Sequence, residues 1–139
     1  MKRRKERERV LQVLYALEYN SIPVEELLNQ FETSFKKDLS QFSYRLIEKT
    51  NSNKVSLDTL IKEHIFNWDF SRLAIIDKIL LRMAVAELLY FDDIPPEVTL
   101  NEIIEISKIY STERSGKFLN GILDAILKDV RSGKVQLNH

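Results

Sequence analysis

The sequence predicts an all-α fold, and three observations carry that prediction. Every strong hydrophobic periodicity in the 139 residues has the three- and four-residue spacing of amphipathic helices. Three Gly and three Pro leave little material for the many tight turns of a β-sandwich. The stretch 71–90 is apolar on nearly all sides, which is typical of a helix surrounded by its neighbours. We therefore expect about seven helices in a single domain spanning 1–139.

The N-terminal half is expected to contain four helices. Apolar side chains at helical spacing place them over about 3–19, from Pro23 through Phe35, over about 39–50, and around 57–65. Pro23 suits the first position of the second helix, because no intrahelical bond needs its missing N–H there. Asn51-Ser52-Asn53 is either a break between the third and fourth helices or a kink within one longer helix.

The C-terminal half is expected to contain three more helices. The central one spans about Ser71–Tyr90, and Asp92–Pro96 ends it because proline disfavours helical backbone in the preceding residue. Thr99 and Glu102 have the spacing of a capping box, which predicts a helix start at Thr99. The final helix carries a long apolar stripe and is expected to stop near Gly133.

A glycine inside the final helix needs a separate explanation. Gly121 lowers helix stability, by about 1 kcal/mol relative to Ala, so we expect it to permit the close approach of another helix.

Composition favours a soluble, cytoplasmic protein. Apolar residues make up 44% of the chain and charged residues 30%, the balance of a globular domain. The absence of Cys excludes a disulfide framework and any thiolate metal site, and it fits a reducing compartment. No leader-like segment is present, and no run approaches the roughly 18 apolar residues of a membrane helix.

The chain offers little for catalysis. Its two histidines, His64 and His139, have no metal-ligand spacing, and no Gly-rich phosphate loop or nucleophile elbow is present. The paired acids Glu25-Glu26 and Asp92-Asp93 lack a partner base, and solvated helix ends explain both pairs. We expect a binding protein with no enzymatic activity, no metal and no cofactor.

Basic charge is concentrated at the N-terminus. Residues 1–9 carry six basic and two acidic side chains, a sum of +4, which leaves 15 basic and 19 acidic side chains in the rest. Such a basic arm on a mildly acidic body can attract phosphate groups. The alternative interpretation is a frayed, solvated terminus, because short basic runs are common on soluble proteins.

Two constellations remain as candidates for binding. The first is the arm followed by Gln12 and Tyr15, although Tyr15 equally fits a half-buried edge of the core. The second is Lys117, Phe118 and Asn120, where the phenylalanine lies about 100° around the helix from the apolar stripe. An off-stripe aromatic beside a lysine suits base stacking combined with phosphate contact. The alternative is a wide apolar face.

Three blocks of sequence resemble the NusB family of bacterial transcription antitermination factors. They are Arg7 with Gln12-Val13-Leu14-Tyr15; Trp68, Arg72, Asp77–Ala84 and Glu87-Leu88; and Pro95, Val98, Asn101-Glu102, Glu105 and Lys117–Asp124. Their order and spacing cover essentially the whole chain. The resemblance implies an all-helical fold of two small bundles, a heterodimer with NusE (a small-subunit ribosomal protein), and binding to boxA RNA of ribosomal RNA operons. It also implies an indirect association with RNA polymerase and other Nus factors.

The resemblance also implies roles for individual residues. Those expected to bind RNA are Arg3, Arg4, Lys5, Arg7, Tyr15, Lys117 and Phe118. Arg114 stands where some relatives carry an acid, and we expect it to strengthen the RNA contact. Asp77 corresponds to an acidic NusE contact, whereas Ser71 replaces an acid seen in some relatives.

Two alternative functions stay open at this point. Ribosomal RNA cytosine methyltransferases carry a NusB-like N-terminal domain, but 139 residues hold no cofactor domain and no catalytic Cys. That alternative requires the chain to be a fragment. The other alternative is a helical adaptor without an RNA role, which would leave the basic arm and Lys117-Phe118 unused.

Overall fold

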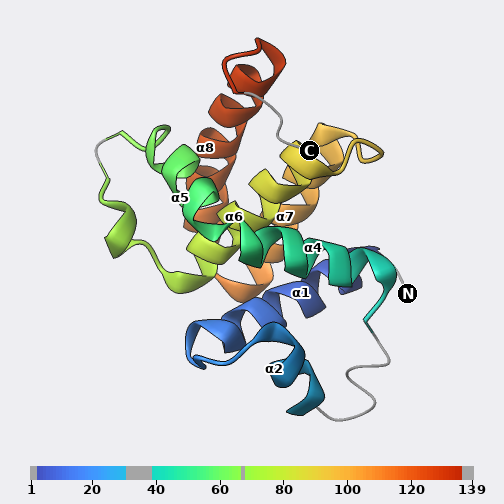
Figure 1. Ribbon diagram of the computed structural model, residues 1–139. Coiled ribbons are helices and arrows are strands. Elements are labelled where there is room, and N and C mark those ends of the chain that lie inside the picture. Colours follow the sequence, from blue (N-terminus) through green and yellow to red (C-terminus); the bar gives the residue numbers. More distant parts are fainter. Residues whose placement is uncertain (1–2, 31–38, 67, 136–139) are drawn as a thin grey trace.

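A computed structural model describes residues 3–30, 39–66 and 68–135, and its elements are helical throughout (Figure 1). The α-helices are α1 (Arg3–Glu18), α2 (Val24–Gln30), α4 (Gln41–Ser52), α5 (Lys54–Lys62), α6 (Ile75–Tyr90), α7 (Pro96–Tyr110) and α8 (Glu113–Arg131), with a 3₁₀ helix η1 (Phe70–Arg72). The predicted all-α class is confirmed. The predicted end of the second helix, at Phe35, lies outside the described residues.

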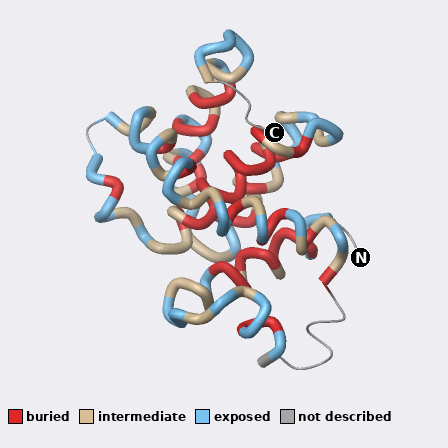
Figure 2. The backbone as a smooth tube through the Cα atoms, in the orientation of Figure 1, coloured by how far each residue is buried: buried red, intermediate tan, exposed pale blue. Residues whose placement is uncertain are grey.

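The helix α6 forms the centre of the fold. It packs against five other helices, namely α1, α4, α5, α7 and α8. Along it, Leu80, Leu81 and Met83 are completely buried, as expected for a helix that is apolar on all sides. Figure 2 shows the buried segments gathered toward the middle of the molecule and the exposed ones at its periphery.

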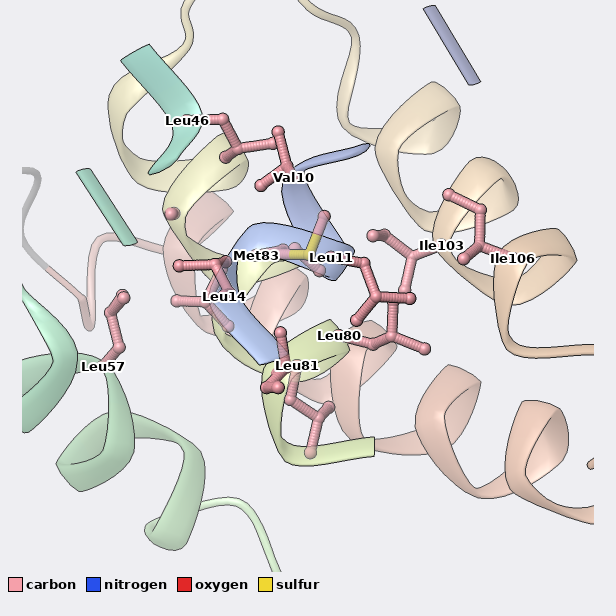
Figure 3. Close-up of a cluster of buried hydrophobic side chains, with 14 of the residues drawn as sticks. Val10, Leu11, Leu14, Leu46, Leu57, Leu80, Leu81, Met83, Ile103 and Ile106 are labelled. Carbon is pink, nitrogen blue, oxygen red and sulfur yellow. The ribbon is translucent and has the colours of Figure 1, made fainter. Parts of the chain in front are cut away.

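The core joins α1 directly to α6 and α7. Figure 3 shows Leu11 and Leu14 of α1 beside Met83 and the two central leucines of α6, with Ile103 of α7 close by. Leu11 is 1% exposed and Ile103 fully buried. Burying such a side chain contributes about 1.5–3 kcal/mol each, so the apolar stripe of α1 is the anchor of the N-terminal segment.

The chain breaks at Asn53 between α4 and α5. Asn53 leaves helical geometry (φ −109°, ψ 16°), and its side-chain Nδ2 donates to the carbonyl of Lys49 at 2.8 Å. The side chain thereby satisfies one of the carbonyls left unpaired at the end of α4. Two separate helices, and not one kinked helix, follow from this cap.

The predicted start of α7 at Thr99 is wrong. The helix begins three residues earlier, with Pro96 at its first position, where a proline is well tolerated. Thr99 is buried, and its hydroxyl donates to Glu87 Oε1 at 2.9 Å instead of capping a backbone amide. Glu102 is likewise not a cap, because its carboxylate accepts from Arg4.

The central helix also begins later than predicted. Ser71 lies in η1, where its N–H and hydroxyl donate to Asp69 Oδ1 at 3.0 and 2.7 Å, and α6 starts only at Ile75. The start of α8 is capped by Thr112, whose hydroxyl accepts from the backbone N–H of Ser115 at 3.0 Å.

The two glycines of the final segment have different outcomes. Gly133 has a left-handed backbone (φ 83°) just past the end of α8, which confirms the predicted stop. No helix approaches Gly121 closely, since a Cβ built there meets no atom within 4 Å. The predicted close helix contact at Gly121 is therefore wrong.

Candidate nucleic-acid interface

Arg7 belongs to the core and not to the surface of the arm. It is 1% exposed, and its Nε and Nη2 donate to the two carboxylate oxygens of Glu87 at 2.8 and 2.7 Å. Glu87 in turn accepts from Thr99, so one buried network joins α1, α6 and α7. This placement does not support the prediction that Arg7 contacts RNA, because both partners of the ion pair are sealed from solvent.

The other predicted cations of the arm remain exposed on the first turns of α1. Arg4 Nε donates to Glu102 on α7 at 3.0 Å, and this hydrogen bond raises the pKa of Arg4. The guanidinium of Arg3 lies 4.1 Å from the ring centroid of Phe42 on α4, a cation–π contact. Lys5 is also exposed. The described part of the arm is thus helical and held against α4 and α7, which argues against a frayed terminus.

One face of α1 is turned toward the end of α7. The hydroxyl of Tyr110 donates to Glu8 Oε1 at 2.9 Å, and Gln12 Nε2 donates to Tyr110 Oη at 3.4 Å. Burial, followed by the bond to Glu8, raises the pKa of Tyr110. Figure 1 shows the turn between α7 and α8 beside α1.

Tyr15 continues that same face of α1. It lies three residues after Gln12, about one helical turn, and its side chain is 40% exposed. Its ring pairs with that of Tyr19, with the centroids 5.1 Å apart. An aromatic pair with exposed surface therefore lies on α1, one helical turn beyond the contact with Tyr110.

A groove of about 500 Å³ lies between η1, the start of α6 and the start of α8. Its lining residues are Trp68, Asp69, Arg72, Leu73, Ala74, Asp77, Thr112, Arg114, Ser115 and Phe118. Trp68 is 62% exposed, and its ring stands edge-to-face against that of Phe118, with the centroids 5.3 Å apart. Arg114 is exposed and adds a positive charge to the groove.

Asp77 also lines this groove, and it is only 6% exposed. Its Oδ2 accepts from the hydroxyl of Ser115 at 2.9 Å, whereas its Oδ1 has no hydrogen-bond partner among the described residues. The predicted NusE contact is therefore not a side chain on an open helix face. The structure brings it together with Arg114 and Phe118, which were predicted to bind RNA.

Lys117 and Phe118 diverge, although they are neighbours in sequence. Lys117 is exposed and lines a separate hollow of about 370 Å³ between α7 and α8, with Ile104, Lys108, Glu113, Gly116 and Asn120. Phe118 is half-buried and packs partly against the core while it lines the groove on the other side of α8. Phe118 is therefore neither a fully buried core residue nor a fully exposed surface for base stacking.

Trp68 and the free oxygen of Asp77 were missed as parts of one site. The segment that carries Trp68 precedes α6 in the chain, and only the folded structure places it beside α8. Two signals were available in the sequence: Trp68 is the only tryptophan of the chain, and it belongs to the second block of the family resemblance. Among the described residues, no group of three or more His, Asp and Glu side chains could hold a metal ion.

A family model described as the NusB family matches residues 4–128. The chain belongs to the NusB family. It is 44% identical over 133 residues to the transcription antitermination protein NusB of Chloroherpeton thalassium, which covers 94% of this chain. The chain spans only 63% of the length of that relative. It is also 41% identical to the NusB protein of Listeria monocytogenes, with 88% of this chain and 94% of the relative covered.

Solved structures of NusB proteins share the fold. NusB from T. maritima superposes with a TM-score of 0.79 at 35% identity, covering 97% of this chain and 99% of that one. A crystal structure of the antitermination factors NusB and NusE in complex with dsRNA contains a chain that superposes with a TM-score of 0.73 at 26% identity, covering 92% and 98%. These likenesses confirm the predicted NusB-like fold and the predicted family.

Family membership supports a binding protein over an enzyme, and neither curated relative described above is named as a methyltransferase. Within the described part of the chain, no helix combines the length and hydropathy needed to cross a bilayer.

Proposed function

We propose that this chain is a transcription antitermination factor that binds boxA-type RNA of ribosomal RNA operons as a heterodimer with NusE. Family membership and the names of its relatives support the antitermination role. The structure of a relative with NusE and RNA supports the two partners. RNA polymerase and other Nus factors then act with it indirectly, in the cytoplasm, where bacterial transcripts are made.

The observation that carries the RNA-binding part is the convergence of cations and aromatics from two distant segments. Lys5 and Tyr15 lie on exposed turns of α1, and Arg114 and Phe118 lie at the start of α8. The hydrogen bonds of Tyr110 hold α1 beside the turn that leads into α8. Cations neutralise phosphates while aromatic rings stack on unpaired bases, so the arrangement fits single-stranded RNA.

The pairing with NusE rests on the solved relative rather than on a surface of this chain. Asp77, the residue associated with NusE by resemblance, is nearly buried in the groove wall. A contact between NusE and Asp77 therefore requires a side chain that enters the groove. An open acidic surface is not available at this position.

A titration of labelled boxA RNA, with and without NusE and at several salt concentrations, tests the proposal. We expect binding that tightens when NusE is present and weakens steeply with salt, because each neutralised phosphate of a single strand contributes about 0.7 to the slope of log K against log salt. A boxA sequence in scrambled order is the control RNA. Equal affinity for the two RNAs, or no binding at low salt with NusE present, would reject the proposed function.

A further inference from the structure

We propose that Glu102 of α7 competes with RNA for Arg4: in the free protein its carboxylate holds the guanidinium, which must leave it to contact a phosphate. The proposal rests on the RNA-binding function proposed above, and it adds a residue that lowers the affinity of the α1 cations for RNA. Glu102 acts through Arg4 and is not itself an RNA contact.

The first observation is the geometry of the ion pair between α1 and α7. Both Nε and Nη2 of Arg4 donate to Glu102 Oε2, at 3.0 and 2.5 Å. The side chain of Glu102 is 17% exposed and that of Arg4 43%, so the pair lies at the edge of the contact between the two helices. Hydrogen bonds between two charged groups are about twice as strong as those between neutral groups. The guanidinium of Arg4 is therefore engaged before any RNA arrives.

The second observation is the negative charge that surrounds Arg4. The hydrogen bond from Glu102, followed by its charge, raises the pKa of Arg4, and the charges of Glu105 and Glu8 raise it further. The same three carboxylates repel an RNA phosphate that approaches the guanidinium. A phosphate contact by Arg4 therefore requires that the ion pair with Glu102 breaks.

Lys5, the next residue of the arm, has different surroundings. It is exposed and forms no ion pair among the described residues. Lys5 can thus meet a phosphate directly, whereas Arg4 must exchange a carboxylate for a phosphate. That exchange is chemically possible, because the guanidinium fork binds the oxygens of either group with similar geometry.

The competition affects all RNA sequences equally. Contacts to phosphate carry no sequence information, so a carboxylate that occupies Arg4 lowers the affinity for every RNA by the same factor. The contacts to bases, which distinguish one RNA from another, are not changed by Glu102. We therefore expect Glu102 to set the absolute affinity and to leave the preference for boxA unchanged.

Glu102→Gln tests the proposal, because it removes the charge of the competitor and keeps the size of the side chain. The full-length protein, with NusE present, is titrated with labelled boxA RNA and with its scrambled control. We expect both affinities to rise by about two- to fivefold, the range of a surface ion pair, and their ratio to stay constant. Glu105→Gln is the matched control on the same helix, since its carboxylate pairs with Lys108 at 3.1 Å. It changes the net charge equally and should raise the affinity much less.

Two further backgrounds test whether Glu102 acts through Arg4. In Arg4→Ala, the additional change Glu102→Gln should have no effect on RNA affinity, because no guanidinium is left to release. Lys5→Ala should lower the affinity itself, but the rise caused by Glu102→Gln should persist there. A merely structural role of Glu102, in holding α1 against α7, predicts the opposite sign: a lower melting temperature and weaker RNA binding in Glu102→Gln.

The remaining outcomes separate this proposal from the proposed function. Equal rises for Glu102→Gln and Glu105→Gln, or a rise that persists in Arg4→Ala, would reveal a general charge effect and overturn the competition. Unchanged or weaker RNA binding by Glu102→Gln would also overturn it, and in each case the RNA-binding function would stand. No binding of any RNA by the wild type or by Glu102→Gln, with NusE present, would overturn both.

Discussion

Arg7 and Glu87 form a bidentate ion pair in the interior of the fold, although 80 residues separate them in the chain. Both side chains are about 1% exposed or less, and Thr99 donates a third hydrogen bond to the same carboxylate. Removing two charges from water is costly, and the pair is tolerated because its geometry satisfies the carboxylate with three donors. The pair fixes the position of α1, and with it the exposed cations of the arm.

Arg7→Ala is expected to destabilise the protein strongly. It leaves the carboxylate of Glu87 buried without its charged partner, which typically costs about 3–5 kcal/mol. Chemical unfolding in urea, followed by circular dichroism, measures the loss.

The double variant Arg7→Met, Glu87→Met is the control for this expectation. Replacing both charges by apolar groups of similar size is often close to neutral, so the double variant should be more stable than Arg7→Ala. A loss below about 1 kcal/mol for Arg7→Ala would show that the ion pair adds little to the apolar stripe that anchors α1.

Helix positions could be predicted from the sequence because the apolar spacing reports the local period directly. The burial and the partners of single charged side chains could not be predicted from the sequence. Arg7 resembles its solvated neighbours in the basic run, and only a partner on α6 distinguishes it. Thr99 has the spacing of an N-cap residue, but the helix begins earlier, at Pro96. The Thr99 hydroxyl instead donates a hydrogen bond to Glu87.

The groove could be predicted only in part, for the same reason. Phe118 and Arg114 were predicted as RNA-binding residues, but their meeting with Trp68 and Asp77 depends on how η1 and α6 pack beside α8. Local periodicity carries no information about contacts between segments that lie so far apart in the chain.

The exposed cations of α1 are expected to set the salt dependence of RNA binding. Replacing Arg3, Arg4 and Lys5 together by Ala should lower the slope of log K against log salt by up to about 2, at roughly 0.7 per phosphate. The fold should persist, because Arg4 and Glu102 form only an exposed surface pair.

The matched control removes three cations at and just beyond the other end of α8, namely Lys128, Arg131 and Lys134. It changes the net charge equally but should leave the salt slope unchanged. Equal slopes for wild type and the α1 variant would refute phosphate contact by the arm.

Glu18 should make stability depend on acidic pH. Burial acts to raise the pKa of Glu18, but hydrogen bonds and charges from Lys54 and Arg82, at 3.0 and 2.9 Å, outweigh it and lower the pKa below its ordinary value of 4.5. A lowered pKa in the folded state means that the stabilisation is present above about pH 4.5 and disappears as pH falls through the folded value.

Glu18→Gln should therefore reduce stability at pH 7 and flatten the loss of stability between pH 5 and pH 3, in thermal melts run across this range. Glu25→Gln, an exposed acid in the first turn of α2, is the control and should follow the wild-type profile. Parallel profiles for wild type and Glu18→Gln would contradict the assignment.

Gly121→Ala is expected to stabilise the protein. The position is exposed within α8, and a Cβ there meets no atom within 4 Å, so alanine adds helix propensity without a clash. The gain should be about 0.5–1 kcal/mol, measurable as a shift of the urea midpoint. A destabilised variant would mean that the surroundings of Gly121 are tighter than the structure shows.

Phe118 and Trp68 should separate stability from RNA binding, because both line the groove but only Phe118 reaches the core. Phe118→Ala should lower RNA affinity by about 1–3 kcal/mol through lost stacking. It should also cost stability, though less than the roughly 3–5 kcal/mol of a fully buried phenylalanine.

Trp68→Ala should lower RNA affinity similarly while changing stability by about 1 kcal/mol or less, since its side chain is mostly exposed. Neither variant should change the salt slope, because stacking neutralises no phosphate. Retained RNA affinity in both folded variants would show that the aromatic wall supports the fold and does not stack on bases.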